Sequence, residues 1–284
     1  MWTTVQRVTL AAVNRSAEKA AMATFSVVTL NTWKADGDYG HRVGLICDGL
    51  KALDPDVVLL QEVFADASGA VHTGEAVRER LRLHHVHHPA RRKPWPLFGV
   101  TVDSTSGLSM LTRTPVADVR RVDLPASPED GERIAQVAAW SWEGAPVTLV
   151  NLHLTHLPDA DDLRIAQLDT TLDAMAPSTV DAAVIGGDLN AEPDGRPIRW
   201  LGEQSTLAVR DAVAEGATGP LPTLADTGGR EMGSRRVDHL LVAEHGTGRR
   251  LRVASAERVL DTPDPASGLL PSDHAGLLVR FGWA

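Results

Sequence analysis

Amide and carboxylate side chains follow several of the apolar runs in this sequence. Asn31 follows Val-Val-Thr-Leu, Glu62 follows Val-Val-Leu-Leu-Gln, and both Asp188 and Asn190 come directly after Ala-Val-Ile-Gly-Gly. One such residue after a strand is usually a turn former or a helix cap. Recurrence of the same pattern at several strand ends indicates a shared site instead.

Three further motifs supply histidine and more carboxylate. Asn151 and His153 lie in Leu-Val-Asn-Leu-His-Leu, Asp238 lies in Arg-Arg-Val-Asp-His, and Asp273 with His274 lies in Ser-Asp-His-Ala-Gly. Hard cations such as Mg²⁺ prefer carboxylate and carbonyl oxygens. Phosphoryl transfer needs a cation on the non-bridging oxygens, a positioned water and proton donors. The six motifs contain these residue types, so they predict metal-assisted attack on a phosphate ester.

The composition excludes some other classes of protein. The 284 residues carry a formal net charge of −9, which disfavours non-specific nucleic-acid binding, and aromatics make up only 4% of the chain. The single cysteine, Cys47, cannot form an internal disulfide, and we interpret it as a structural thiol. No apolar run is long enough for a membrane-spanning helix, and no secretory signal is recognised. These observations predict a cytoplasmic location.

The motifs require strands and helices that bring them together. Apolar runs predict strands, and three- and four-residue spacing of apolar side chains predicts helices. The expected strands are 25–30, 57–60, 107–111, 147–152, 182–185, 237–242 and 276–279, and the expected helices are 42–53, 75–83 and 162–175. Strands that are apolar on both faces must be covered by helices or by a second sheet, which indicates an α/β sandwich. We interpret residues 1–23 as an N-terminal extension and 24–284 as the catalytic domain.

The order of the six motifs resembles the endonuclease/exonuclease/phosphatase superfamily over about residues 25–281. Among its branches, the motifs are more similar to the sphingomyelinase-like and deoxyribonuclease-like enzymes than to the abasic-site endonucleases. The resemblance implies an α/β (α+β) fold, a four-layered sandwich of two mixed β-sheets flanked by helices, with the active site at one edge. It also implies Mg²⁺ or Mn²⁺ as cofactor, with Glu62 as the principal metal ligand, Asn31 beside it and Asp273 assisting.

The resemblance implies catalytic roles for five further residues. Asp188 would orient or deprotonate the attacking water with help from Asn190, although a histidine can also be the base. His274 would contact the scissile phosphate while Asp238 accepts a hydrogen bond from its other ring nitrogen. His153 would act on the other side of the phosphate as an electrophile or proton donor. In the pancreatic-type deoxyribonucleases a glutamate pairs with this histidine, and we find no equivalent here.

Substrate recognition is expected around the segment 83–96, Leu-His-His-Val-His-His-Pro-Ala-Arg-Arg-Lys-Pro-Trp-Pro. It can be a basic loop that holds an extra phosphate or an anionic headgroup through Arg91 and Arg92. It can also be a strand followed by a solvated proline-rich loop, or a second, zinc-type site. Asn151 is assigned to substrate binding, with a supporting role as the alternative. The segment 218–235 is expected to be a long loop.

These observations predict a divalent-metal-dependent phosphodiesterase that hydrolyses a P–O bond. Its substrate would be a phosphate ester, whether a small molecule, a lipid headgroup or a nucleic acid, and no obligate protein partner is inferred. One alternative is a DNA or RNA endonuclease of the same superfamily. The other, from a different class, is a non-catalytic binding module with the same fold.

Overall fold

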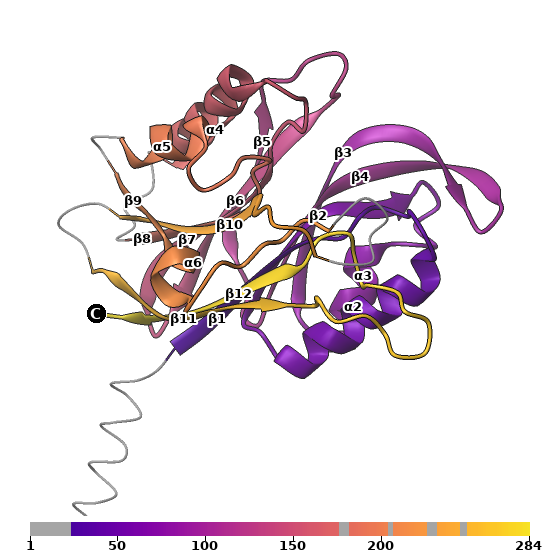
Figure 1. The fold of residues 1–284 in the computed structure, drawn as a ribbon, viewed down its shortest axis with the longest axis horizontal. Helices are drawn as coiled ribbons and strands as arrows, with labels where there is room; N and C mark the ends of the chain where they lie inside the picture. The colour runs from indigo at the N-terminus through magenta and orange to yellow at the C-terminus, as the bar shows by residue number, and fades with distance from the viewer. Residues whose placement is uncertain (1–23, 176–181, 204–206, 226–231, 245–248) are drawn as a thin grey trace, which may run out of the picture.

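Two six-stranded β-sheets form the centre of the protein (Figure 1). The computed structural model describes residues 24–175, 182–203, 207–225, 232–244 and 249–284. The first sheet has the order β11 (Leu251–Val259), β12 (Gly276–Trp283), β1 (Thr24–Asn31), β2 (Val57–Asp66), β4 (Val100–Thr112) and β3 (His84–Leu97). The second has the order β5 (Ala117–Leu124), β6 (Arg133–Trp142), β7 (Ala145–His153), β8 (Ala182–Asp188), β10 (Asp238–Glu244) and β9 (Ala208–Asp211).

Each sheet is mixed, with one parallel pair among antiparallel neighbours. The parallel pairs are β1 with β2 in the first sheet and β7 with β8 in the second. In a parallel pair the carboxyl ends of both strands lie at the same edge. The register therefore places Asn31 beside Gln61 in one sheet and His153 beside Asp188 in the other.

The two sheets pack face to face, and helices cover their outer faces. Phe25, Leu59, Leu149, Leu240 and Phe281 belong to the buried cluster between the sheets. Outside, α2 (Tyr39–Leu53) and α3 (Thr73–Leu81) cover the first sheet, while α4 (Asp161–Met175) and α5 (Arg196–Gly202) cover the second (Figure 1). A short helix, α6 (Ala212–Gly216), packs on β10 and β11. The arrangement confirms the four-layered sandwich of two mixed sheets.

Local sequence explains why α2 begins and ends where it does. The Asp38 carboxylate accepts a hydrogen bond from the backbone N–H of His41, which satisfies one of the free donors in the first turn. Ile46 and Leu50, four residues apart, are fully buried against the sheet. Asp54 adopts a left-handed conformation, and Pro55 follows it, so the helix cannot continue.

The predicted strands and helices all occur, and several strands that were not predicted join them. β5 is the clearest case, because its sequence Ala-Asp-Val-Arg-Arg-Val-Asp-Leu is largely exposed and lacks an apolar run. β6, β9 and β11 were missed as well. The expectation of a proline-rich loop after residue 88 was wrong: residues 84–97 form one continuous strand paired with β4. Proline is tolerated there because β3 is an edge strand, where a missing N–H leaves no ladder bond unmade.

Two predicted features lie wholly or partly outside the described residues. The proposed N-terminal extension, 1–23, is one, and part of the expected loop 218–235 is the other. Within the part of the chain that is described, no helix is long and apolar enough to cross a membrane.

Candidate active site

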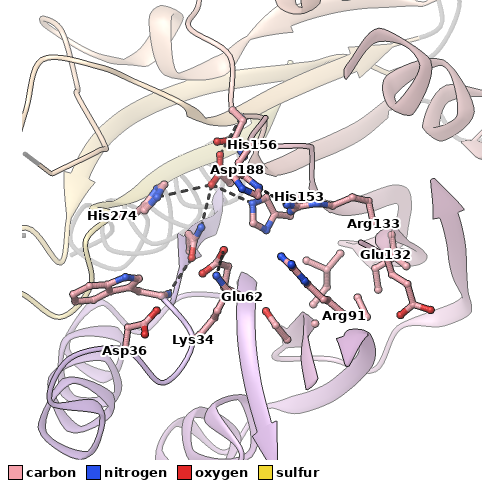
Figure 2. A pocket seen from close by; sticks show the side chains of 18 of the residues that line it. Lys34, Asp36, Glu62, Arg91, Glu132, Arg133, His153, His156, Asp188 and His274 are labelled. Carbon is pink, nitrogen blue, oxygen red and sulfur yellow. Dashed lines mark hydrogen bonds and ion pairs between the residues drawn. The ribbon is translucent and has the colours of Figure 1, made fainter. Parts of the chain in front are cut away.

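A pocket of about 250 Å³ opens at the edge of the sandwich where β1, β7 and β8 end and β2 has a bulge (Figure 2). It brings together eight of the eleven predicted site residues: Asn31, Glu62, Arg91, His153, Asp188, Asn190, Asp273 and His274. Asp238 is fully buried behind His274, with which it forms a hydrogen bond. The remaining two, Asn151 and Arg92, do not line the pocket.

Gly187 positions the Asp188 carboxylate at the end of β8. Its φ is +150°, and a Cβ there would lie 1.9 Å from the carbonyl oxygen of Leu152, so only glycine allows this close approach of β8 to β7. The register then places Asp188 opposite Asp238 on β10 and beside His153 on β7. Strand pairing therefore gathers three of the predicted catalytic side chains.

Asp188 is fully buried and receives hydrogen bonds from both sides. Asn31 Nδ2 donates to its Oδ2 at 3.0 Å, and the backbone N–H of Asn190 donates to Oδ1 at 2.9 Å. The Nε2 atoms of His153 and His274 lie 3.5 and 3.9 Å from Oδ2. Burial, reinforced by repulsion from Asp238, raises the pKa of Asp188 to about 7. A carboxylate with such a pKa can take and release a proton near neutral pH.

His274 is held as an imidazolium by Asp238. Its Nδ1 donates to Asp238 Oδ2 at 2.8 Å. Burial lowers the pKa of His274, but attraction and hydrogen bonding from Asp238, with attraction from Asp188 and Asp273, outweigh this and raise the pKa to about 10. Asp238 is fixed in turn at its backbone, whose N–H donates to Thr223 Oγ1 at 3.2 Å. The charged ring points its Nε2 toward Asp188 and the pocket.

His153 has the opposite character and is neutral. Burial, with repulsion from Arg133, Lys34 and His274, lowers its pKa well below the ordinary value. Among the described residues, Asp188 is the acidic partner of His153, and no glutamate takes the place expected from the deoxyribonuclease branch. His153 is therefore suited to donate a hydrogen bond rather than to supply charge.

Glu62 on β2 and Asp273 in the segment before β12 both line the pocket. Glu62 lies in a β-bulge between Leu60 and Val63, with φ +52°, and its carboxylate is 3.1 Å from Lys34 Nζ. Burial raises the pKa of Asp273 to about 6; His274 opposes the rise and repulsion from Glu62 adds to it. Two mutually repelling carboxylates beside the Asn31 amide form a donor set that suits a hard divalent cation, since the cation would relieve the repulsion. The residues present therefore fit the metal that the sequence predicts.

Asp188, Asp238 and His274 also offer ligand atoms that lie within 4.8 Å of one another. Because His274 Nδ1 is already hydrogen-bonded to Asp238, we interpret this group as a carboxylate–imidazole pair that holds a proton. Among the described residues, the β3 histidines do not form such a group. His85 and His87 lie on the α3 side, where both contact Ser109 Oγ, while His88 contacts Gln136. The zinc-type alternative therefore has no support within the described residues.

Two loops of the site are joined by buried hydrogen bonds. Ser272 Oγ donates to the Asn31 carbonyl at 2.7 Å and accepts from the His274 N–H at 3.2 Å. The buried guanidinium of Arg42 donates to the carbonyls of Thr32 and Pro271 at 3.1 and 3.0 Å. The segment after β1 and the segment before β12 are therefore held as one unit.

Asn151 does not reach the pocket, so the assignment to substrate binding is corrected to a supporting role. Its side chain is fully buried and bridges the two sheets. Its Nδ2 shares two hydrogens among three acceptors at 3.1 Å, the carbonyls of Leu60 and Ser109 and Gln136 Oε1, and its Oδ1 accepts from Gln61 Nε2 at 2.8 Å. These bonds hold the strand pair at the bulge that carries Glu62.

Only one of the two predicted arginines enters the pocket. Arg91 points into the cavity near Glu62 (Figure 2), whereas Arg92 is exposed and lines no part of it. Side chains alternate between the two faces of a strand, so neighbouring positions on β3 cannot face the same cavity. The assignment of Arg92 to substrate binding is therefore corrected.

The sequence did not single out four further pocket residues, Lys34, Glu132, Arg133 and His156. Arg133 is held by the fully buried Asp130, whose Oδ2 accepts from Arg133 Nε at 2.8 Å. Arg133 and Glu132 were missed because β6 and the turn before it carry no motif. Lys34 and His156 had a detectable signal, since each lies within three residues of a predicted site residue.

A sequence profile of the Endonuclease/Exonuclease/phosphatase family matches residues 28–274, which includes the strand-end motifs and the pocket. The chain belongs to this family. Members of the endonuclease/exonuclease/phosphatase family are hydrolases that act on phosphoester bonds, generally with a divalent metal.

Solved structures of the family share this fold. An endonuclease/exonuclease/phosphatase from Bacteroides vulgatus is 18% identical, with a TM-score of 0.72, 92% of this chain and 100% of that chain being covered. The human Nocturnin catalytic domain with bound sulfate is 20% identical, with a TM-score of 0.69 and 92% and 95% coverage. A mannosyl-6-phosphatase from Bacteroides thetaiotaomicron is 17% identical, with a TM-score of 0.69 and 91% and 99% coverage. No curated protein matches the sequence.

Proposed function

We propose that residues 24–284 form a phosphodiesterase that depends on Mg²⁺ or Mn²⁺ and hydrolyses a P–O bond by attack of water. The observation that carries this proposal is the Asp188 carboxylate, whose pKa is about 7, set between an imidazolium and a neutral imidazole at one pocket wall. The carboxylates of Glu62 and Asp273 line the same pocket. The groups for water activation and for charge neutralisation thus share one cavity.

The metal would be held by Glu62 and Asp273, with the amide oxygen of Asn31 beside them. When bound there, Mg²⁺ or Mn²⁺ supplies a Lewis acid that polarises the phosphoryl group. Asn31 Oδ1 also accepts the N–H of Trp33 at 3.0 Å, which fixes the amide with its nitrogen toward Asp188. Asn31 therefore connects the metal ligands to the carboxylate that handles the water.

Asp188 is the general base in this proposal. His274 is already protonated and His153 binds a proton weakly, so neither ring competes with Asp188 for the proton of the water near neutral pH. Asn31 and the N–H of Asn190 hold the two carboxylate oxygens in place. One face of Asp188 therefore stays directed at the pocket.

The two histidines bind the phosphate in different ways. His274 Nε2 directs a charged N–H at it, and Asp238 keeps that charge in place as negative charge develops on oxygen. His153 donates a neutral hydrogen bond from the other side, and Arg133 behind it contributes positive charge. Charge-assisted bonds of this kind are about twice as strong as neutral ones.

The test compares several phosphate esters with one protein. We expect Mn²⁺-dependent hydrolysis of bis-p-nitrophenyl phosphate that chelation abolishes, measured beside plasmid DNA, an abasic duplex and sphingomyelin. His274→Ala should lower turnover by about 10²–10⁴-fold with an unchanged circular dichroism spectrum. The matched control is His84→Ala, because His84 is an exposed histidine on β3.

Each alternative has its own outcome. Cleavage of DNA with no action on the other esters would establish the endonuclease alternative. Binding of Mn²⁺ without turnover of any ester, together with no effect of Glu62→Ala, would establish a non-catalytic binding module. Equal loss of activity in the His274 and His84 variants would contradict the assigned role of His274.

A further inference from the structure

Two grooves of opposite charge extend from the pocket. The basic groove is a small cavity of about 20 Å³ beside the β3–β4 hairpin, with room for about one water, and is lined by Lys34, Phe64, Arg91, Lys93, Trp95 and the segment 104–106. It shares Lys34, Arg91 and Ser106 with the pocket, so the two cavities adjoin. Its lining includes three cations and, among the described residues, no carboxylate.

The acidic groove leaves the pocket on the other side, at His156 and Asn190, which it shares with the pocket. Four carboxylates and two guanidinium groups line it: Asp159, Asp161, Glu192, Asp194, Arg164 and Arg235. Both guanidinium groups are already paired, Arg164 with Asp161 at 2.8 Å and Arg235 with Glu192 at 2.8 Å. Asp159 and Asp194 form no salt bridge among the described residues, so this side carries net negative charge.

The cations of the basic groove are not neutralised in the same way. Arg91 and Lys93 form no salt bridge with any described residue, and Lys34 contacts Glu62 at the pocket end. Trp95 fixes the two lysines instead, with Lys93 Nζ 4.1 Å and Lys34 Nζ 5.6 Å from its ring centroid. Desolvation, and then repulsion from Arg91 and Lys34, lowers the pKa of Lys93, and attraction from Asp36 and Glu62 does not offset this.

We propose that the cations around the mouth of the basic groove bind a second anionic group of the substrate, and that the preferred substrates are small phosphate esters that carry two anionic groups. This proposal rests on the phosphoesterase function proposed above. With one phosphate at His274 and Asp188, a second anion on the Glu62 side meets Arg91 and Lys93 directly. A long polyanion that crossed the site would have to continue into the acidic groove, where Asp159 and Asp194 repel it.

Trp95 has a positioning role in this scheme and is not a stacking platform. The ammonium groups of Lys34 and Lys93 lie at cation–π distances from the Trp95 ring. A nucleobase that stacked on this ring would have to displace them. The pocket itself, about 250 Å³, is slightly smaller than the roughly 300–1,000 Å³ common for ligand sites. Both features favour a compact, doubly charged ligand over a stacked nucleobase chain.

The experiment measures inhibition by phosphonates of increasing charge and spacing. Hydrolysis of bis-p-nitrophenyl phosphate with excess Mn²⁺ is followed in the presence of methylphosphonate or of bisphosphonates with one to four methylene groups. At least one bisphosphonate should inhibit about tenfold or more tightly than methylphosphonate, because it gains charge-assisted bonds to two cations. Calorimetric titration with the same compounds gives a readout that needs no turnover.

Substitutions on β3 distinguish the effect of the groove residues from that of a neighbouring exposed residue. The double variant Arg91→Gln with Lys93→Gln should abolish the bisphosphonate advantage and leave methylphosphonate inhibition within about threefold. Arg92→Gln, on the opposite face of β3, is the matched control and should keep the full advantage. Trp95→Leu should reduce the advantage because the lysines lose their anchor.

The outcomes distinguish failure of the second-anion site from failure of the phosphoesterase function. The second-anion site is refuted if no bisphosphonate exceeds methylphosphonate, or if the advantage survives the double substitution. Cleavage of plasmid DNA with a higher kcat/KM than bis-p-nitrophenyl phosphate would overturn the role of the acidic groove. Absence of turnover on every ester would contradict the phosphoesterase function, while the calorimetric titration would still test the second-anion site.

Discussion

Replacement of Asn151 by alanine should destabilise the protein without removing a substrate contact. The side chain is 0% exposed and has four hydrogen-bonding partners, the carbonyls of Leu60 and Ser109 and the side chains of Gln136 and Gln61. Three of these partners belong to the first sheet, and Leu60 and Gln61 lie at the bulge that carries Glu62. The substitution therefore leaves polar groups unpaired at the centre of the sandwich.

The expected loss of stability follows from what each partner retains. Gln61 Nε2 keeps its hydrogen bonds to Thr29 Oγ1 and the Leu59 carbonyl, so the lost bond to Asn151 costs little stability. The carbonyls of Leu60 and Ser109 and the Gln136 Oε1 together lose two buried N–H donors, at about 1–3 kcal/mol for each group left unsatisfied. Because partial relaxation relieves some of this, we expect a decrease of about 3–4 kcal/mol in the free energy of unfolding.

Urea denaturation followed by tryptophan fluorescence measures the change. Thr101→Ala, at an exposed position of β4, is the control and should stay within about 0.5 kcal/mol of the wild type. At saturating Mn²⁺ the KM of Asn151→Ala for a small ester should stay within about threefold. A stability within 0.5 kcal/mol of the wild type, together with a KM raised about tenfold, would refute the supporting role and restore the substrate contact.

Three other changes test separate parts of the site and fold. Glu62→Gln should shift the Mn²⁺ dependence of activity to at least about tenfold higher concentration; an unchanged dependence would place the metal at Asp188, Asp238 and His274 instead. Asp238→Asn should lower kcat by about 10²-fold or more at pH 7, because His274 loses the partner that keeps it charged, and a twofold effect would contradict this. Burial, with repulsion from neighbouring histidines, lowers the pKa of His87 to about 3, below the 6.5 of the unfolded chain. The unfolded chain therefore binds the proton first, and stability falls as the pH drops below about 6.5. The contribution of His87 reaches about 2 kcal/mol at pH 5. Urea denaturation at pH 8 and pH 5 measures the total change in stability, and His87→Leu should reduce that change by about this amount.

Local sequence was sufficient for the apolar runs and the polar residues that follow them. Asn31 and Asp188 end their strands as predicted, whereas β2 continues through the bulge at Glu62 to Asp66. The order of the motifs identifies the family and its layered fold. Strand and turn signals depend on a few neighbouring residues, so they can be recognised without knowledge of the rest of the chain. The edge strand β3 was harder, because its histidines and prolines contain no apolar run.

Tertiary structure alone decided which side chains share a cavity. Asn151 and His153 lie on the same face of β7, and only the packing of the sheets shows that Asn151 is buried between them while His153, at the end of the strand, reaches the pocket. Arg91 and Arg92 are equivalent in the sequence, and only the pairing of β3 with β4 turns one of them toward Glu62. Side-chain direction in a strand reverses at every residue, and the phase of that alternation is set by contacts between distant strands. The six motifs thus contain the chemistry of the site, while the packing of the second sheet on the first determines its charge and shape.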